Sequence, residues 1–142
     1  MQLIVELSDE HRELADHAAY LRHVVSAPVP DPAAVAALRW RFVQLLHDHC
    51  VREQRQVYQP LMGSGDAVAS GIALRCDEDF GQVAQAFRDY VADWPIGRIA
   101  HDWAGFGAAT RATLGLIAAR IEAEERELYP QAQRVLGARR AA

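Results

Sequence analysis

The residue types best suited to chemistry lie in two similar stretches of the chain. One begins at His49 and reads HCVREQRQVYQP, and the other begins at Arg120 and reads RIEAEERELYP. In each, the basic first residue is followed four positions later by a glutamate, Glu53 or Glu124. Four residues make about one helical turn, so each pair projects from one helix face. Two such faces turned toward each other could hold a metal ion or, because one basic residue is an arginine, an internal salt bridge.

These stretches are expected on long amphipathic helices. Apolar residues recur at helical spacing in four segments, the second running from about Pro32 to Met62 and the last ending near Leu136. Turns rich in proline or glycine separate the segments at 27–32, 63–66 and 94–97. No stretch predicts a strand. We therefore expect an all-α protein, an up-down-up-down four-helix bundle.

The turns also predict which residues share a height in the bundle. Antiparallel helices align residues that are equidistant from the connecting turn. His11 lies nineteen residues before the first turn, centred near Pro30, and His49 nineteen after it. The two imidazoles should therefore lie side by side. The second turn likewise places Glu53 near the height of Asp77, which we expect on the inner face of the third segment.

The alignment gathers polar groups at one level of an otherwise apolar bundle. The set comprises His11, His49, Glu53, Asp77, Arg120 and Glu124. Burying such groups unpaired costs roughly several kcal/mol each, so a metal, one another or water must satisfy them. Bundle interiors hold metals through carboxylate and imidazole ligands on facing helices.

The motifs resemble those of the hemerythrin family, in particular the bacterial hemerythrin-like domains. In these, helix 2 reads H-x-x-x-E and helix 4 reads H-I-x-x-E-E-x-x-L-Y-P. The match covers most of the chain in helix order and spacing, and its most specific part is IEAEERELYP at 121–130. The resemblance implies a hemerythrin-like bundle with a non-haem di-iron centre. Carried over residue by residue, it places His11, His49, Glu53 and Glu124 at ligand positions.

Two ligand positions depart from the family pattern. Arg120 stands where helix 4 of the family has a histidine, and arginine has no lone pair to give a metal. No histidine occurs between His49 and His101, so the third helix offers at best Asp77 or Cys76. The remaining nitrogen and oxygen ligands suffice for one ion but poorly for two.

These departures favour a degenerate centre. The Arg120 guanidinium can lie between Glu53 and Glu124 as an internal counter-charge in place of iron. We expect a cytoplasmic binding or regulatory module that holds little or no metal and is not an enzyme. One alternative is a single weakly bound ion. The other is an intact di-iron centre in a protein that binds dioxygen or nitric oxide, or senses or stores iron.

Length and composition limit the other classes. The 142 residues suit one domain spanning 1–142. The net charge is −4, and the fifteen basic residues are scattered arginines without a clustered basic face, so nucleic acid is not an expected partner. No apolar run approaches the roughly 20 residues of a membrane span, and the N-terminus has no secretory pattern.

The remaining candidates are expected to be structural. Surface or flanking positions are expected for His17, His23, His47 and His101. Packing, or the face of a homodimer, is expected for Trp40, Trp94 and Trp103. The acidic run at 122–127 should be a solvated helix face apart from Glu124. Neither cysteine has a C-x-x-C partner, and both should be small buried apolar residues.

Overall fold

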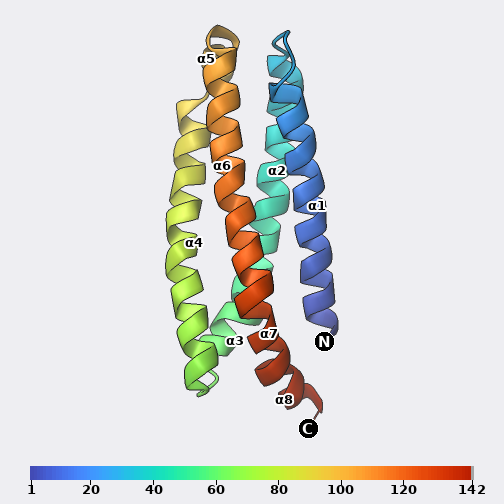
Figure 1. Ribbon diagram of the computed structural model, residues 1–142, viewed down its shortest axis with the longest axis vertical. Helices are drawn as coiled ribbons and strands as arrows, with labels where there is room; N and C mark the ends of the chain where they lie inside the picture. Colours follow the sequence, from blue (N-terminus) through green and yellow to red (C-terminus); the bar gives the residue numbers. More distant parts are fainter. Residues whose placement is uncertain (142) are drawn as a thin grey trace.

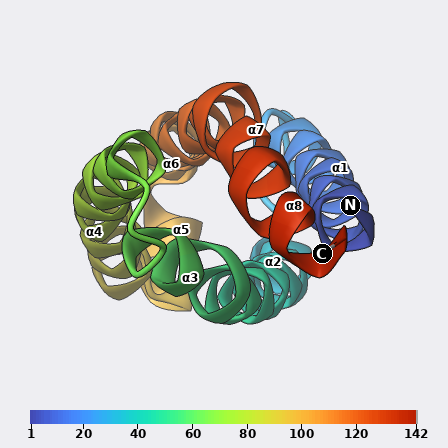
Figure 2. The same cartoon turned by 90° about the horizontal axis from the view of Figure 1, so that it is seen from below.

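Four long helices run side by side along the molecule. The computed structural model describes residues 1–141, with side chains described through Arg139. The long helices are α1 (Gln2–Val25), α2 (Pro32–Glu53), α4 (Ala67–Asp93) and α6 (Trp103–Ala123). They lie roughly parallel to the long axis (Figure 1) and surround a common centre when viewed end-on (Figure 2). All regular structure of the described residues is helical, which confirms the predicted all-α bundle.

Aspartates begin three of these helices. Asp31 accepts a hydrogen bond from the backbone N–H of Ala34, and Pro32 occupies the first turn of α2. Asp66 caps α4 in the same way, and Asp102 caps α6 by accepting from the N–H of Gly105. A side-chain oxygen at this position satisfies a backbone N–H that has no partner within the helix.

The last long helix begins later than the sequence predicts. A short helix, α5 (Ile96–His101), follows the break at Trp94, and α6 starts only after Asp102. Asp102 explains this second break, because its backbone leaves the helical conformation and its side chain caps α6; at Gly105, a Cβ would meet the capping carboxylate. Without a side chain at Gly105, the capping carboxylate closes against the first turn of α6.

Two of the long helices continue through wider turns. The continuations are η1 (Gln54–Tyr58) and α3 (Gln59–Met62) after α2, and η2 (Glu124–Leu128), α7 (Tyr129–Ala132), η3 (Gln133–Gly137) and α8 (Ala138–Ala141) after α6. The turns η1, η2 and η3 are π-helical. Glu53 and Glu124 thus lie where an α-helix passes into a π turn, a feature often found at functional sites.

Prolines account for the first two of these wider turns. Pro60 and Pro130 lack an N–H and clash with the carbonyl four residues earlier. Just before each proline, the backbone bonds instead to the fifth preceding carbonyl: Gln59 N–H donates to Gln54, and Tyr129 N–H donates to Glu124. The repeated pattern of glutamate, tyrosine and proline in the sequence therefore encodes the same local widening twice.

The core has an apolar cluster on each side of a polar level. One cluster includes Leu7 and Leu128, and the other includes Leu14 and Ile117. His11 lies on α1 between Leu7 and Leu14 and is itself buried. The polar groups are therefore enclosed by apolar side chains along the bundle axis. Among residues 1–141, no helix has the length and apolar character needed to cross a membrane.

The inner face of α4 differs from the predicted one. Its buried residues are Ala69, Ala73, Cys76 and Tyr90. Leu74, although apolar, is 50% exposed. The helix is turned by about one residue from the predicted orientation, and one residue corresponds to roughly 100° around a helix.

Candidate metal centre

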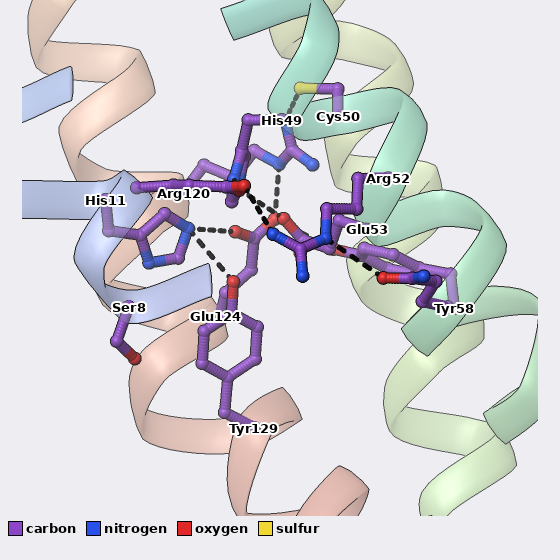
Figure 3. Close-up of polar contacts among 12 residues, drawn as sticks. Ser8, His11, His49, Cys50, Arg52, Glu53, Tyr58, Arg120, Glu124 and Tyr129 are labelled. Atoms are coloured by element: carbon purple, nitrogen blue, oxygen red, sulfur yellow. Dashed lines mark hydrogen bonds and ion pairs between the residues drawn. The ribbon is translucent and has the colours of Figure 1, made fainter. Parts of the chain in front are cut away.

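Four buried side chains from three parts of the chain meet at the polar level of the bundle. They are His11 of α1, His49 and Glu53 of α2, and Glu124 of η2. One ligand atom from each lies within 4.8 Å of the others, and every side chain is at most 4% exposed. The rings of His11 and His49 have centroids 4.6 Å apart, which is the juxtaposition that the spacing predicts. Figure 3 shows the side chains converging.

The imidazoles are oriented by carboxylates behind them. The Nδ1–H of His11 donates to Glu125 Oε1 at 2.7 Å, and that of His49 donates to Glu10 Oε2 at 2.9 Å. This tautomer follows from the partners, because an ionised carboxylate only accepts. The Nε2 lone pairs of both rings then face the cluster. Metal-binding histidines are commonly held this way, with the outer nitrogen bonded to a carboxylate.

Both supporting carboxylates are themselves held in place. Ser8 donates to the second oxygen of Glu125 at 3.0 Å. Arg52 donates to Glu10 Oε1 at 2.9 Å and also pairs with Glu6. These contacts join α1 to η2 on one side of the centre and α1 to α2 on the other, so each imidazole is fixed by a two-step chain of hydrogen bonds.

Inside the cluster, acceptors face acceptors. His49 Nε2 lies 2.6 Å from Glu53 Oε2, and His11 Nε2 lies 3.2 Å from Glu124 Oε2. Although His49 and Glu53 are in close contact, neither His49 Nε2 nor either carboxylate oxygen of Glu53 takes part in a hydrogen bond with suitable geometry. Lone pairs this close in a buried space require positive charge between them, supplied by a cation or by protons. The two imidazole nitrogens and the carboxylate oxygens form a donor set that fits a metal ion.

The two buried glutamates have opposite pKa shifts. Burial and the negative charge of Glu124 raise the pKa of Glu53. Burial alone would raise the pKa of Glu124, but contacts with His11, Arg120 and Tyr58 outweigh burial and lower it. The charge of Glu124 is therefore compensated within the protein, whereas the contacts of Glu53 with His49 and Arg120 do not outweigh its burial and the charge of Glu124.

The environment of His49 also favours a positive charge, as the raised pKa of its imidazole shows. Burial alone would lower its pKa, but the contacts with Glu53 and Glu10 outweigh burial and raise it. A proton or a metal ion on this imidazole is thus stabilised by the carboxylates around it.

Arg120 supplies the internal positive charge. Its Nε lies 2.6 Å from Glu124 Oε1, as an ion pair in which the N–H does not point along the line between the atoms. Its Nη1 donates to Cys50 Sγ at 3.3 Å, and its Cζ lies 3.5 Å from the ring centroid of Phe80. Within the described residues it forms no ion pair with Glu53. The counter-charge therefore sits beside one glutamate, not between the two.

Two buried tyrosines complete the inner contacts. Tyr58 donates to Glu124 Oε1 at 2.9 Å, so Arg120 and Tyr58 share that oxygen while Oε2 faces His11. Tyr129 donates to His11 Nε2 at 3.2 Å, a hydrogen bond that a cation on this nitrogen would displace, and its ring stacks on the imidazole at 5.2 Å. Burial and the nearby glutamates raise the pKa of both phenols, which keeps them protonated as donors.

Asp77 lies outside the cluster, contrary to the expectation that it faces the centre. It is half-buried, and its neighbour Cys76 takes the inward position on α4. Burial raises the pKa of Cys76 to about 11, so its thiol stays neutral. In the part of the chain that the structure describes, α4 supplies no member of the cluster.

The sequence pattern does not reveal the carboxylates that support the centre. Glu125 belongs to the acidic run that predicts a solvated face, yet it supports His11, and no motif distinguishes Glu10, which supports His49. A signal existed for the tyrosines, because Tyr58 and Tyr129 each follow a site glutamate by five residues. The other four histidines do not join the cluster; three are exposed and one is half-buried.

Comparison with known proteins identifies the family. The family model described as Hemerythrin HHE cation binding domain matches residues 2–132. Comparisons with curated proteins and with solved structures found no match. The family match spans all four long helices and every member of the buried His/Glu cluster. The chain belongs to the hemerythrin HHE cation-binding domain family.

Proposed function

We propose that the protein is a hemerythrin-like module that binds one divalent cation through His11, His49, Glu53 and Glu124. The observation that carries this proposal is the convergence of four buried donors in which His49 Nε2 and both oxygens of Glu53 have no directed hydrogen bond. Imidazole with carboxylate suits iron, zinc or manganese. The family resemblance makes ferrous iron the expected ion.

The compactness of the donor set favours one ion over two. Metal–ligand bonds of about 2.0–2.2 Å in a tetrahedral site separate the ligand atoms by roughly 3.4 Å. Donors within 4.8 Å of one another can close on a single ion with small movements. A second ion would need further donors, and the Arg120 guanidinium beside Glu124 would repel it.

A bound iron ion would supply a redox-active Lewis acid able to take a small diatomic ligand. The chain's own groups around it act mainly on the ligands. Tyr58 and Arg120 hold one oxygen of Glu124, and the ring of Tyr129 stacks on His11. Because these polar groups are engaged with ligands, not turned to a substrate, we infer a sensing or regulatory role without catalysis. We place the module in the cytoplasm, which its two free cysteines support.

Metal analysis of protein purified from iron-supplemented cells tests this proposal. We expect about one ion per chain. His11→Ala should lose the ion, whereas His17→Ala, a matched change of a half-buried histidine elsewhere on α1, should keep it. Two irons per chain with oxo-bridged absorption in the near ultraviolet would contradict a single-ion centre. Protein that stays metal-free after incubation with ferrous, zinc and manganese ions would contradict cation binding altogether.

A metal-free core is the second candidate. The Arg120–Glu124 ion pair and the raised pKa values of His49 and Glu53 support it, because protons on the latter groups could replace the cation. This is the module with little or no metal that the sequence alone favours. The same metal analysis separates the two candidates.

A further inference from the structure

A second feature opens beside the metal centre, in the seam between α2 and α4. It is a partly open cavity of about 260 Å³, which we call the seam pocket. Its apolar walls include Leu46 of α2, Phe80 and Phe87 of α4, and Ile117 of α6. Of the groups at the metal centre, only Arg120 lines it, together with its partner Cys50. The pocket is therefore a neighbour of the cation site and not part of its donor cluster.

The polar lining of the seam pocket is basic. It consists of His47, Arg88 and Arg120 with the Cys50 thiol, and no carboxylate is among the described lining residues. The neighbouring cavity on the other side of Arg120 differs, since Asp79 and Glu124 line it. Arg88 forms no ion pair in the described part of the chain, whereas Arg120 is paired with Glu124, which lies outside the pocket lining. The pocket lining therefore presents basic groups without a carboxylate, and such a surface attracts an anion. Apolar walls with a few basic groups suit a molecule that is mostly hydrocarbon and carries one negative charge.

Arg120 is held in a position to receive that charge. Its guanidinium lies over Phe80, which forms part of the pocket wall, with Cζ 3.5 Å from the ring centroid. Nε faces Glu124 and Nη1 faces Cys50. Arginine is not deprotonated in proteins, so the guanidinium remains charged. A planar guanidinium in the wall of a largely apolar pocket is well matched to a planar carboxylate.

We propose that the seam pocket binds a medium-chain aliphatic monocarboxylate, with its carboxylate at Arg120 and its hydrocarbon tail between Phe80 and Phe87. The volume of about 260 Å³ lies just below the range of about 300–1,000 Å³ that is usual for ligand sites, which suits a small ligand with a hydrocarbon chain. The exposed Arg88 adds positive charge at the rim. The inference goes beyond the proposed function and does not rest on it, because Arg120 is charged with or without a cation at the centre.

Calorimetric titration of the full chain with three probes tests whether binding needs both a carboxylate and a hydrocarbon tail. Octanoate should bind at one site and at least about tenfold more tightly than 1-octanol, which has the tail without the charge. Acetate, which has the charge without the tail, should give no measurable binding. Equal affinity for octanoate and octanol, or no saturable octanoate binding, would overturn the proposal.

A variant that fills the seam pocket tests whether octanoate binds there. Ala84 lines the pocket on α4, so Ala84→Phe should fill it and weaken octanoate binding at least about tenfold. Gln82→Phe adds the same ring at an exposed position of α4 and should bind octanoate like the wild type. Circular dichroism checks that both variants remain helical. Wild-type affinity in a folded Ala84→Phe variant would place the carboxylate elsewhere and overturn the proposal.

Two further measurements separate this inference from the cation proposal. Arg88→Gln, at an exposed position, should weaken octanoate binding several-fold and leave octanol binding unchanged. Titrations repeated on metal-free and on iron-incubated protein should both show octanoate binding. Octanoate binding by a chain that takes up no metal would refute the cation site and leave the seam pocket standing.

Discussion

Glu10 on α1 accepts a hydrogen bond from His49 Nδ1 on α2 at 2.9 Å, and thereby turns the other nitrogen of that ring into the buried cluster. The next residue, His11, enters the cluster itself and is supported from η2 by Glu125. Two consecutive residues of α1 thus serve the same centre in different ways, one as a donor and the other as the support of a donor on the neighbouring helix.

Removing the support of His49 should weaken cation binding. Glu10→Ala deletes the carboxylate that orients Nδ1–H, and loss of such a partner typically costs about 10–100-fold in metal affinity. Competition with a chelator of known affinity measures the change. Glu13→Ala, an exposed glutamate on the same helix, is the control and should leave the affinity unchanged. An unaltered affinity for Glu10→Ala would show that the imidazole is oriented by other contacts.

Removing the internal counter-charge should destabilise the fold. Arg120→Ala leaves Glu124 buried without its ion-pair partner, and breaking a buried pair costs about 3–5 kcal/mol. Urea denaturation of metal-free protein measures the free energy of unfolding. Arg126→Ala, which removes a largely exposed arginine, should change it by less than about 1 kcal/mol. Equal stabilities of the two variants would argue against a counter-charge role for Arg120.

Replacing the counter-charge by a ligand should change the metal content. Arg120→His restores the residue that the hemerythrin pattern has on the fourth helix and removes the charge that repels a second cation. We expect iron content to rise above that of the wild type after reconstitution, measured by elemental analysis. Arg120→Gln removes the charge without adding an imidazole and should not produce the same increase.

The hydrogen bond from Tyr58 to Glu124 should contribute to stability. Tyr58→Phe removes the donor at 2.9 Å and leaves a buried charged acceptor with one partner fewer, at a cost of about 1–3 kcal/mol. Tyr20→Phe, at a residue that is 56% exposed, is the matched control and should be nearly neutral. Urea denaturation of both variants provides the comparison, and a neutral Tyr58→Phe would mean that water or another group satisfies Glu124.

Stability should depend on pH through a contact remote from the centre. Asp66 accepts two hydrogen bonds from Arg134 at 2.8 Å and also caps α4, and these contacts lower its pKa. A lowered folded-state pKa stabilises the fold above the unfolded value, near 3.9, and this stabilisation is lost as the pH falls through the folded-state pKa. The Tm difference between wild type and Asp66→Asn should therefore be largest near neutral pH and shrink in strong acid.

An exposed aspartate provides the control for this pH effect. Asp16→Asn alters a residue of α1 on the solvent side and should change Tm little at either pH. A Tm difference for Asp66→Asn that stays constant from neutral to strongly acidic solution would show that the carboxylate charge does not stabilise the fold.

The bundle was predictable from the sequence because its signals are local. Apolar spacing along the chain sets which segments become helices, and the turns at 27–32 and 63–66 set where the chain reverses. Equal distances from the first turn bring His11 and His49 together, since antiparallel helices rise by the same amount per residue. The later start of α6 also has a local cause, which is the N-cap formed by Asp102. The nearby Gly105 and Gly107 only partly indicate this start in the sequence.

The surroundings of the centre depended on the tertiary structure, because each residue step turns a helical side chain by roughly 100°. One such step on α4 puts Cys76 inside in place of Asp77. The pairing of Glu10 with His49 and of Arg120 with a single oxygen of Glu124 likewise depends on the rotation of helices about their axes. The sequence by itself determined the helices, their order and the candidate donors; packing between helices decided which polar groups meet.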